Sequence, residues 1–183
     1  MNPRRIVITG APASGKTVFF ERLKKDRRLG GYAFFDELAR QLLNVDPTLR
    51  ADRGRFHQLI YRQQIEQEAA LPPDQPFITD RGTLDAWAFH PELLEELGTT
   101  IEAEYARYTD ILFLESAAAL GPDFYRQDGI RTETIDDVRI IEGATRRIWG
   151  EHPGFRQVAA SLDLEEKYGR FLELIVELTG RQT

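Results

Sequence analysis

Residues 10 to 17 read Gly10-Ala11-Pro12-Ala13-Ser14-Gly15-Lys16-Thr17, which matches the phosphate-binding pattern G-x-x-x-x-G-K-[ST] at every fixed position. Glycines permit backbone conformations that a side chain would block, so successive N–H groups can turn toward a phosphate. In this pattern the lysine supplies a cation to the β- and γ-phosphates, and the threonine supplies a hydroxyl to Mg²⁺. The predicted nucleotide-binding residues are Gly10, Ala13, Ser14, Gly15, Lys16, Thr17 and Val18.

The sequence on either side of this loop fits the same interpretation. Residues 4–9 form a β-branched run that ends directly at Gly10, as is typical of a buried parallel strand. Residues 17–25 have the pattern of a helix, whose positive end would point at the same phosphate. Strand, glycine loop and helix in this order are the context that the motif requires.

Length and composition restrict the class of protein. A chain of 183 residues, with 42% hydrophobic and 30% charged residues, predicts a single α/β domain over residues 1–183. The net charge of −6 argues against general binding to nucleic acid. The absence of cysteine excludes disulfides and thiolate metal sites. No apolar run is long enough to span a membrane and no signal peptide is recognised, so we expect a cytoplasmic protein.

Further strands and helices alternate along the chain. Strands are predicted at residues 32–35, 76–79, 110–114 and 155–159. One helix is predicted from Pro91 to Tyr108, another after a capping signal at Thr134, and a last one at residues 164–178. This alternation predicts a three-layer α/β/α fold with a parallel sheet, whose ligands bind at the carboxyl ends of the strands.

Acidic residues stand where three of these strands end. Asp80 could hold Mg²⁺ or its waters, and Arg81 beside it could bind a phosphate or substrate oxygen; the alternative for this pair is a structural ion pair. Asp36 and Glu37 could orient or deprotonate an accepting hydroxyl, or they could simply open the next helix. For Glu115 a capping or solvated role is favoured over catalysis.

Two longer segments are candidates for contact with the substrate. Residues 121–133 are polar and contain glycine, which is typical of a lid that brings an arginine, Arg126 or Arg131, to the developing charge. The alternative is a solvated loop. Residues 52–70 carry many polar side chains, for which substrate contact and solvent exposure are both open. An acceptor pocket is expected within residues 37–70.

Taken together, the motifs resemble a family of small P-loop AAA-type ATPases and kinases typified by the ribosylnicotinamide-kinase domain of NadR-type proteins. The shared patterns are G-x-P-x-S-G-K-T at residues 10–17, E-x-A-R at 37–40, Asp-Arg at 80–81 and D-G-x-R at 128–131. The resemblance implies a strand order of 2-3-1-4-5, ATP or GTP with Mg²⁺, and a small-molecule acceptor. It also favours Glu37 over Asp36. The adenylyltransferase domain of the bifunctional members has no counterpart in the sequence.

These observations predict an enzyme that transfers a phosphoryl group from a nucleoside triphosphate to a small, nucleoside-like acceptor. In this interpretation Lys16, Glu37, Asp80, Arg81, Arg126 and Arg131 are the catalytic candidates, and Thr17 and Asp80 hold the metal. The alternative is a regulatory nucleotide-binding protein that hydrolyses ATP or GTP slowly and acts as a switch on a partner. The protein would be a monomer or a homodimer, with no nucleic acid or membrane as its partner.

Overall fold

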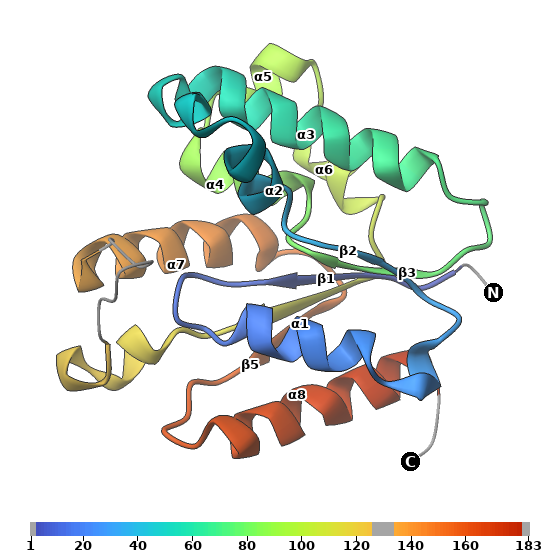
Figure 1. Ribbon diagram of the computed structural model, residues 1–183, viewed down its shortest axis with the longest axis vertical. Helices are drawn as coiled ribbons and strands as arrows, with labels where there is room; N and C mark the ends of the chain where they lie inside the picture. The colour runs from blue at the N-terminus through green and yellow to red at the C-terminus, as the bar shows by residue number, and fades with distance from the viewer. Residues whose placement is uncertain (1–2, 126–133, 181–183) are drawn as a thin grey trace.

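The computed structural model describes residues 3–125 and 134–180 and contains a five-stranded sheet with the order β2-β3-β1-β4-β5 (Figure 1). Every pair of neighbouring strands is parallel. The strands are β1 (Arg5–Thr9), β2 (Ala33–Phe35), β3 (Phe77–Asp80), β4 (Asp110–Leu114) and β5 (Phe155–Val158). The predicted fold class and strand order are confirmed.

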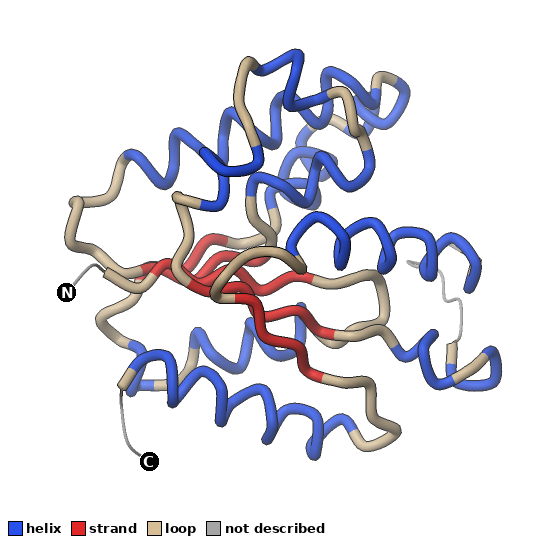
Figure 2. The backbone as a smooth tube through the Cα atoms, turned by 180° about the vertical axis from the view of Figure 1, so that it is seen from behind, coloured by secondary structure: helices blue, strands red, loops and turns tan. Residues whose placement is uncertain are grey.

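Helices cover both faces of the sheet, as the views from the front and from behind show (Figures 1 and 2). On one face lie α1 (Lys16–Lys24) and α8 (Leu164–Thr179). On the other lie α2 (Leu38–Val45), α3 (Arg53–Ala69), α4 (Thr83–Phe89), α5 (Leu93–Leu97), α6 (Ile101–Tyr105) and α7 (Ile135–Trp149). Short 3₁₀ helices occupy Arg27–Leu29, Pro47–Ala51, Ala117–Leu120 and Pro122–Phe124.

The core is divided by the sheet because successive side chains of a strand point to opposite faces. Ile6 and Ile8 of β1 pack in one cluster with side chains of α1 and α8. Val7, between them, packs in the opposite cluster with Trp149 of α7. β1 is therefore buried on both faces, and the loop that follows it begins from a firmly packed strand.

One predicted helix is divided in two. The apolar pattern from Pro91 to Tyr108 predicts a continuous helix, but the structure has α5 and α6 in its place. Gly98 ends α5 with φ +66°, a left-handed conformation that glycine adopts without strain. Thr100 then caps α6 by accepting a hydrogen bond from Ala103 N. Leu94 of α5 and Ile101 and Tyr105 of α6 still pack in the core, because each short helix keeps its own buried face.

The start of α7 is where the sequence predicts it. Thr134 accepts from Asp137 N, and the Asp137 carboxylate accepts from Thr134 N, which is a capping box. Among the helices of the described residues, none has the length and apolar character that crossing a membrane requires.

Candidate functional site

The phosphate loop connects β1 to α1, and its glycines stand where the backbone requires them. Gly10 has φ +140°, and a Cβ atom there would lie 2.2 Å from the Leu114 carbonyl oxygen of β4. Gly15 has φ +90° immediately before α1. Ala13, with φ +60°, is also left-handed. Because side chains are strained in these conformations, the glycine positions of the motif follow from the loop geometry.

Lys16 folds back onto the loop from which it projects. Its Nζ donates to the carbonyl oxygens of Gly10 (2.5 Å) and Ala11 (3.0 Å) and to the Ser14 hydroxyl (3.2 Å), and the residue is 8% exposed. Burial and the nearby Arg81 guanidinium lower the pKa of Lys16 to about 8, against the opposing effect of the acidic groups around it. To bind a phosphate, this ammonium would have to exchange its carbonyl partners for phosphate oxygens.

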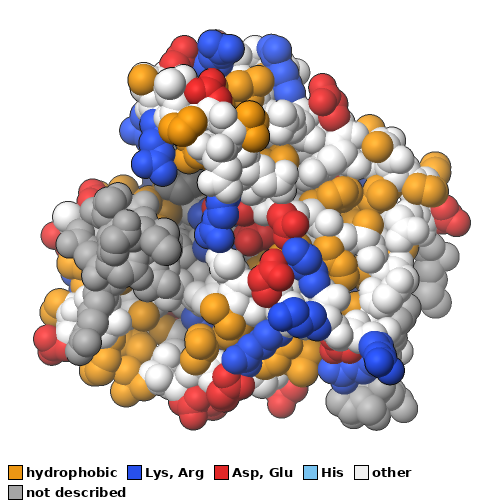
Figure 3. Space-filling model, viewed as in Figure 1, with side chains coloured by type: hydrophobic (Ala, Val, Ile, Leu, Met, Phe, Trp, Pro, Cys, Tyr) orange, Lys and Arg blue, Asp and Glu red, His pale blue; other side chains and the backbone are white. Residues whose placement is uncertain are grey.

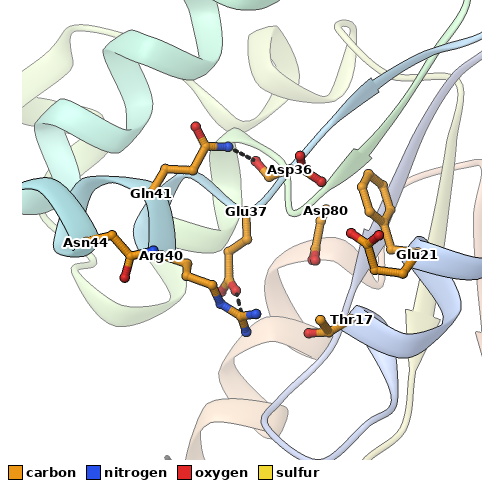
Figure 4. A pocket seen from close by; sticks show the side chains of 9 residues that line it. Thr17, Glu21, Asp36, Glu37, Arg40, Gln41, Asn44 and Asp80 are labelled. Carbon is orange, nitrogen blue, oxygen red and sulfur yellow. Dashed lines mark hydrogen bonds and ion pairs between the residues drawn. The ribbon is translucent and has the colours of Figure 1, made fainter. Parts of the chain in front are cut away.

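A cleft of about 360 Å³ opens beside the phosphate loop, between α1 and α2. It is lined by Thr17, Phe20, Glu21, Asp36, Glu37, Arg40, Gln41, Asn44 and Asp80. The close view shows these side chains converging from α1, from the junction of β2 with α2, from α2 itself and from the end of β3 (Figure 4). In the space-filling view, acidic and basic side chains gather in the middle of this face (Figure 3). Of the expected acceptor range 37–70, α2 and the residue before it line this cleft, and α3 does not.

Asp80 ends β3 opposite Ile8 of β1 and lines the cleft. It is 6% exposed, and its Oδ1 has no hydrogen-bond partner among the described residues. Burial raises the pKa of Asp80 to about 6, although the Lys16 ammonium acts to lower it. A buried carboxylate oxygen without a donor fits a cation, and Thr17 adds a hydroxyl to the same cleft.

No cluster of three or more acidic or histidine side chains suited to a metal occurs in residues 3–125 and 134–180. A site made of Asp80 and Thr17 agrees with that finding if the metal is Mg²⁺. This ion commonly takes one or two protein ligands and fills its other positions with phosphate oxygens and water.

Arg81 forms its ion pairs with two residues other than its neighbour Asp80. Its Nε donates to Glu37 (3.0 Å) and its NH1 donates to Asp85 (3.1 Å). The backbone of Arg81 has φ +78°, a left-handed conformation that is uncommon for arginine. The ion pair that the sequence left open for Asp80 and Arg81 is thus replaced by two others, and the pair with Glu37 joins the ends of β2 and β3.

Glu37 precedes α2, yet its side chain makes no capping bond to that helix. Burial acts to raise the pKa of Glu37, but the Arg81 and Lys16 cations outweigh it, and the pKa lies below its usual value. Asp36 lies beside it on the rim of the cleft, exposed, where it accepts a hydrogen bond from Lys24 (2.7 Å). Of the two candidates, Glu37 is thus the one that contacts the arginine at the end of β3.

Asp85 is a buried residue of α4 to which the sequence pattern gave no role of its own. It accepts hydrogen bonds from the Thr9 hydroxyl, Gly82 N (2.9 Å), Arg81 NH1 (3.1 Å) and Trp149 Nε1 (3.2 Å), and it is 2% exposed. The sequence does offer one signal for Asp85, since an acidic residue at the third position of a helix commonly accepts a hydrogen bond from the N-cap backbone, here Gly82 N. Its contacts with Thr9 and Trp149 depend on the tertiary fold.

The remaining candidates fall into two groups. Arg126 and Arg131, with most of the expected lid at residues 121–133, lie outside the described residues; Tyr125, just before them, is buried. Glu115 accepts from Arg146 (2.8 Å) and from Ala160 N (2.9 Å), and so connects the ends of β4 and β5.

The polar side chains of residues 52–70 include some that bind neighbouring elements of the fold and do not line the cleft. On α3, Tyr61 donates to Glu104 of α6 (2.7 Å), and Gln64 donates to Thr79 of β3 (3.2 Å). Binding to neighbouring elements is thus a third role for this stretch, besides the predicted alternatives of substrate contact and solvent exposure. Arg53, Arg55 and Arg62 of the same helix are exposed, so the polarity of α3 reflects both internal hydrogen bonds and contact with solvent.

Comparisons with known proteins agree with this geometry. A deoxyadenosine kinase from M. mycoides, solved with the products dCMP and a flexible dCDP, superimposes with a TM-score of 0.65 at 13% identity, over 95% of this chain and 99% of that one. A structure of deoxyadenosine kinase from the same organism with bound dATP gives a TM-score of 0.60 at 14% identity, over 93% and 98%. At such low identity these likenesses establish a kinase-like P-loop fold and no more.

Sequence comparisons place the chain in a family. No curated protein sequence matches it. A family model described as AAA domain matches residues 5–167, which span the phosphate loop, the cleft and all five strands. The chain therefore belongs to this AAA domain family of P-loop nucleotide-binding proteins.

Proposed function

We propose that the protein is an ATP- or GTP-dependent kinase that phosphorylates a hydroxyl group of a small, nucleoside-like molecule. The observation that carries this proposal is the cleft beside the phosphate loop, into which Glu37, Asp80 and Thr17 converge (Figure 4). A protein that only hydrolyses its nucleotide needs no cleft that extends from Thr17 and Asp80 to the side chains of α2. The nucleoside kinases with the same fold support a nucleoside-like acceptor.

The residues of the site have complementary roles in this proposal. Amides of the phosphate loop and Lys16 bind the triphosphate. Asp80 and Thr17 hold Mg²⁺, which would neutralise charge on the phosphates. The Glu37 carboxylate accepts the proton of the acceptor hydroxyl while that oxygen forms a bond to the γ-phosphorus. The bond from phosphorus to the bridging oxygen then breaks, and the nucleoside diphosphate leaves.

The electrostatics of Glu37 suit this role. Because Arg81 and Lys16 hold its pKa below the usual value, Glu37 is ionised at neutral pH and can accept a proton or a hydrogen bond. The ion pair with Arg81 also fixes the carboxylate at one side of the cleft. Arg81 itself would be available to a phosphate oxygen when that ion pair rearranges.

A panel of acceptors tests the proposal. The nucleotide-free protein is mixed with a non-hydrolysable ATP analogue, Mg²⁺ and individual nucleosides, vitamins or sugars, and thermal unfolding is measured. An acceptor at 100 times its Kd stabilises the protein by about 2.7 kcal/mol beyond the analogue alone. Any compound that does so is then tested for acceptor-dependent release of ADP.

The regulatory alternative gives a different result in the same experiment. If no compound adds to the stabilisation, and ATP or GTP is hydrolysed slowly at a rate that no acceptor changes, the protein is a nucleotide-dependent switch and the kinase proposal is wrong. Steady turnover that requires the acceptor supports the kinase.

A further inference from the structure

Three consecutive carbonyl groups of the phosphate loop are bound from the side of β4 and α8. The Ser116 hydroxyl donates to Pro12 O (2.7 Å), Ala117 N donates to Ala13 O (3.2 Å), and Lys167 Nζ donates to Ser14 O (2.8 Å). We refer to these three hydrogen bonds as the backing contacts. Their donors come from the segment after β4 and from α8, which are more than 100 residues away in the sequence.

The backing contacts have a consequence for the amides that follow each carbonyl. In a planar trans peptide the C=O and the next N–H point in opposite directions. A donor that holds the oxygens of Pro12, Ala13 and Ser14 on one side therefore directs the N–H groups of Ala13, Ser14 and Gly15 to the other. Those N–H groups are the ones that a phosphate loop offers to an anion.

Lys167 is the unusual member of this set. It is 3% exposed, and its ammonium donates both to Ser14 O and to Glu115 O (2.5 Å) at the end of β4. Among the described residues it forms no ion pair within 4.0 Å, so its buried charge is held by two carbonyl oxygens. A buried ammonium is costly unless it is well hydrogen-bonded. An apolar side chain at this position of α8 would avoid the free-energy cost of burying a charge. The presence of lysine therefore argues for a role that depends on those two carbonyl groups.

The same segment is also connected to α7. Glu142 accepts a hydrogen bond from Ser116 N (2.9 Å), and Ser116 in turn donates to Pro12 O. The loop therefore rests on three elements, namely the segment after β4, α7 through Glu142, and α8 through Lys167. Such support fixes peptide orientations before any ligand arrives, and pre-organised donors bind an anion without a reorganisation cost.

We propose that Lys167 is a positioning residue for phosphate binding, which holds the Ser14 peptide so that Gly15 N–H faces the bound phosphates. This inference rests on the proposed function only in that the loop binds a nucleoside triphosphate. It assigns to α8, far from the motif in sequence, a direct part in the affinity of the loop. Ser116 has a parallel but smaller role through Pro12.

Calorimetric titration with a non-hydrolysable ATP analogue and Mg²⁺ tests the role of Lys167. Lys167→Met deletes the donor at similar length, and Lys25→Met, at an exposed lysine that follows α1, is the matched control. We expect Lys167→Met to raise the Kd about tenfold or more, the loss typical of a charged hydrogen bond. Lys25→Met should leave the Kd unchanged, and Lys167→Arg, which keeps a cationic donor, should recover part of the affinity.

The titration separates positioning from a purely structural role. The stoichiometry reports the fraction of folded protein, while the Kd reports the loop itself. A purely structural lysine would lower the stoichiometry or the melting temperature and leave the Kd of the folded fraction as in the wild type, which would overturn the proposal. If Lys167→Met does not fold, Ser116→Ala removes one hydroxyl donor and should still raise the Kd about threefold; an unchanged Kd there overturns it too.

A second measurement observes the peptide directly. In ¹H–¹⁵N spectra of the wild type, the Gly15 amide should shift strongly when the analogue is added, and in Lys167→Met this shift should shrink. A Gly15 shift that is equal in the two proteins contradicts the proposal. A wild type that binds neither ATP nor GTP would instead refute the proposed function, so the two failures are distinguishable.

Discussion

The two sides of the cleft are built in different ways. On the phosphate side, the loop between β1 and α1 is shaped by positive-φ residues and by hydrogen bonds to its own carbonyl groups. On the side where we propose that the acceptor binds, called the acceptor side below, the shape depends on charged side chains. Arg81 is the main one, because it joins Glu37 and Asp85 from different elements. Backbone geometry tolerates few sequences, whereas a network of side chains can be built in many ways. In the proposed function, the phosphate side is therefore the general part of the molecule, and the acceptor side carries its specificity.

The largest expected effect is on the phosphate side. Lys16→Ala removes the ammonium that binds the phosphates in the proposed function, and we expect acceptor-dependent transfer to fall on the order of 10³-fold. Nucleotide affinity, measured by titration with the ATP analogue, should fall with it. Lys25→Ala is the control, since that lysine is exposed. Nucleotide binding and transfer that both survive Lys16→Ala would mean that the loop is not the triphosphate site.

On the acceptor side, Glu37→Gln should separate binding from chemistry. Glutamine can still accept a hydrogen bond from Arg81 but cannot take a proton, so transfer should fall about 10²-fold or more. The Kd for the ATP analogue should stay near that of the wild type, because the phosphate side is intact. Glu173→Gln, on the exposed surface of α8, is the matched control. Full activity of Glu37→Gln would mean that another residue accepts the proton. The proposed division of roles between the phosphate side and the acceptor side would then be wrong.

Asp80 stands between the two sides, and its replacement should stabilise the nucleotide-free protein. Burial raises the pKa of Asp80 to about 6 from the usual 3.8, so the folded state favours the protonated carboxyl. That contribution to stability is complete below pH 3.8 and is lost as the pH rises through 6. Asp80→Asn, which carries no charge, should therefore increase the free energy of unfolding by about 3 kcal/mol at pH 7.

Urea unfolding of wild type and Asp80→Asn between pH 4 and pH 7 measures this effect. The advantage of the variant should shrink toward pH 4, where the wild-type carboxyl is protonated. The same variant should lose Mg²⁺-dependent transfer, because its side chain no longer offers a charged ligand. Lower stability of Asp80→Asn at pH 7 would show that the buried charge is well compensated by Lys16 and Arg81, and that Asp80 belongs fully to the network of the acceptor side.

This contrast also explains how much the sequence could predict. The phosphate loop and β1 could be predicted from the sequence, because the loop geometry requires glycine at fixed positions and a buried strand directly before it. The strand order 2-3-1-4-5 was predicted from the resemblance to the NadR-type family, not from the pattern of residues. The sequence could not predict the contacts of Arg81 with Glu37 and of Lys167 with Ser14. These residues are 44 and 153 positions apart and meet only when the sheet has formed. The division between α5 and α6 at Gly98 had a visible signal, but the apolar pattern across it was the stronger guide.

The smallest expected effect tests whether the start of α7 influences the phosphate side at all. Thr134 caps α7, and the same helix carries Glu142, which accepts from Ser116 N. Thr134→Ala should lower the free energy of unfolding by about 1 kcal/mol, the usual cost of a lost cap, while Thr134→Ser should cost little. Because Glu142 lies more than one turn inside the helix, fraying at Thr134 should not reach it, and the Kd for the ATP analogue should be unchanged. A weaker Kd in Thr134→Ala, restored in Thr134→Ser, would mean that the first turn of α7 influences the loop through Glu142. The phosphate side would then be less rigid than its backing contacts indicate.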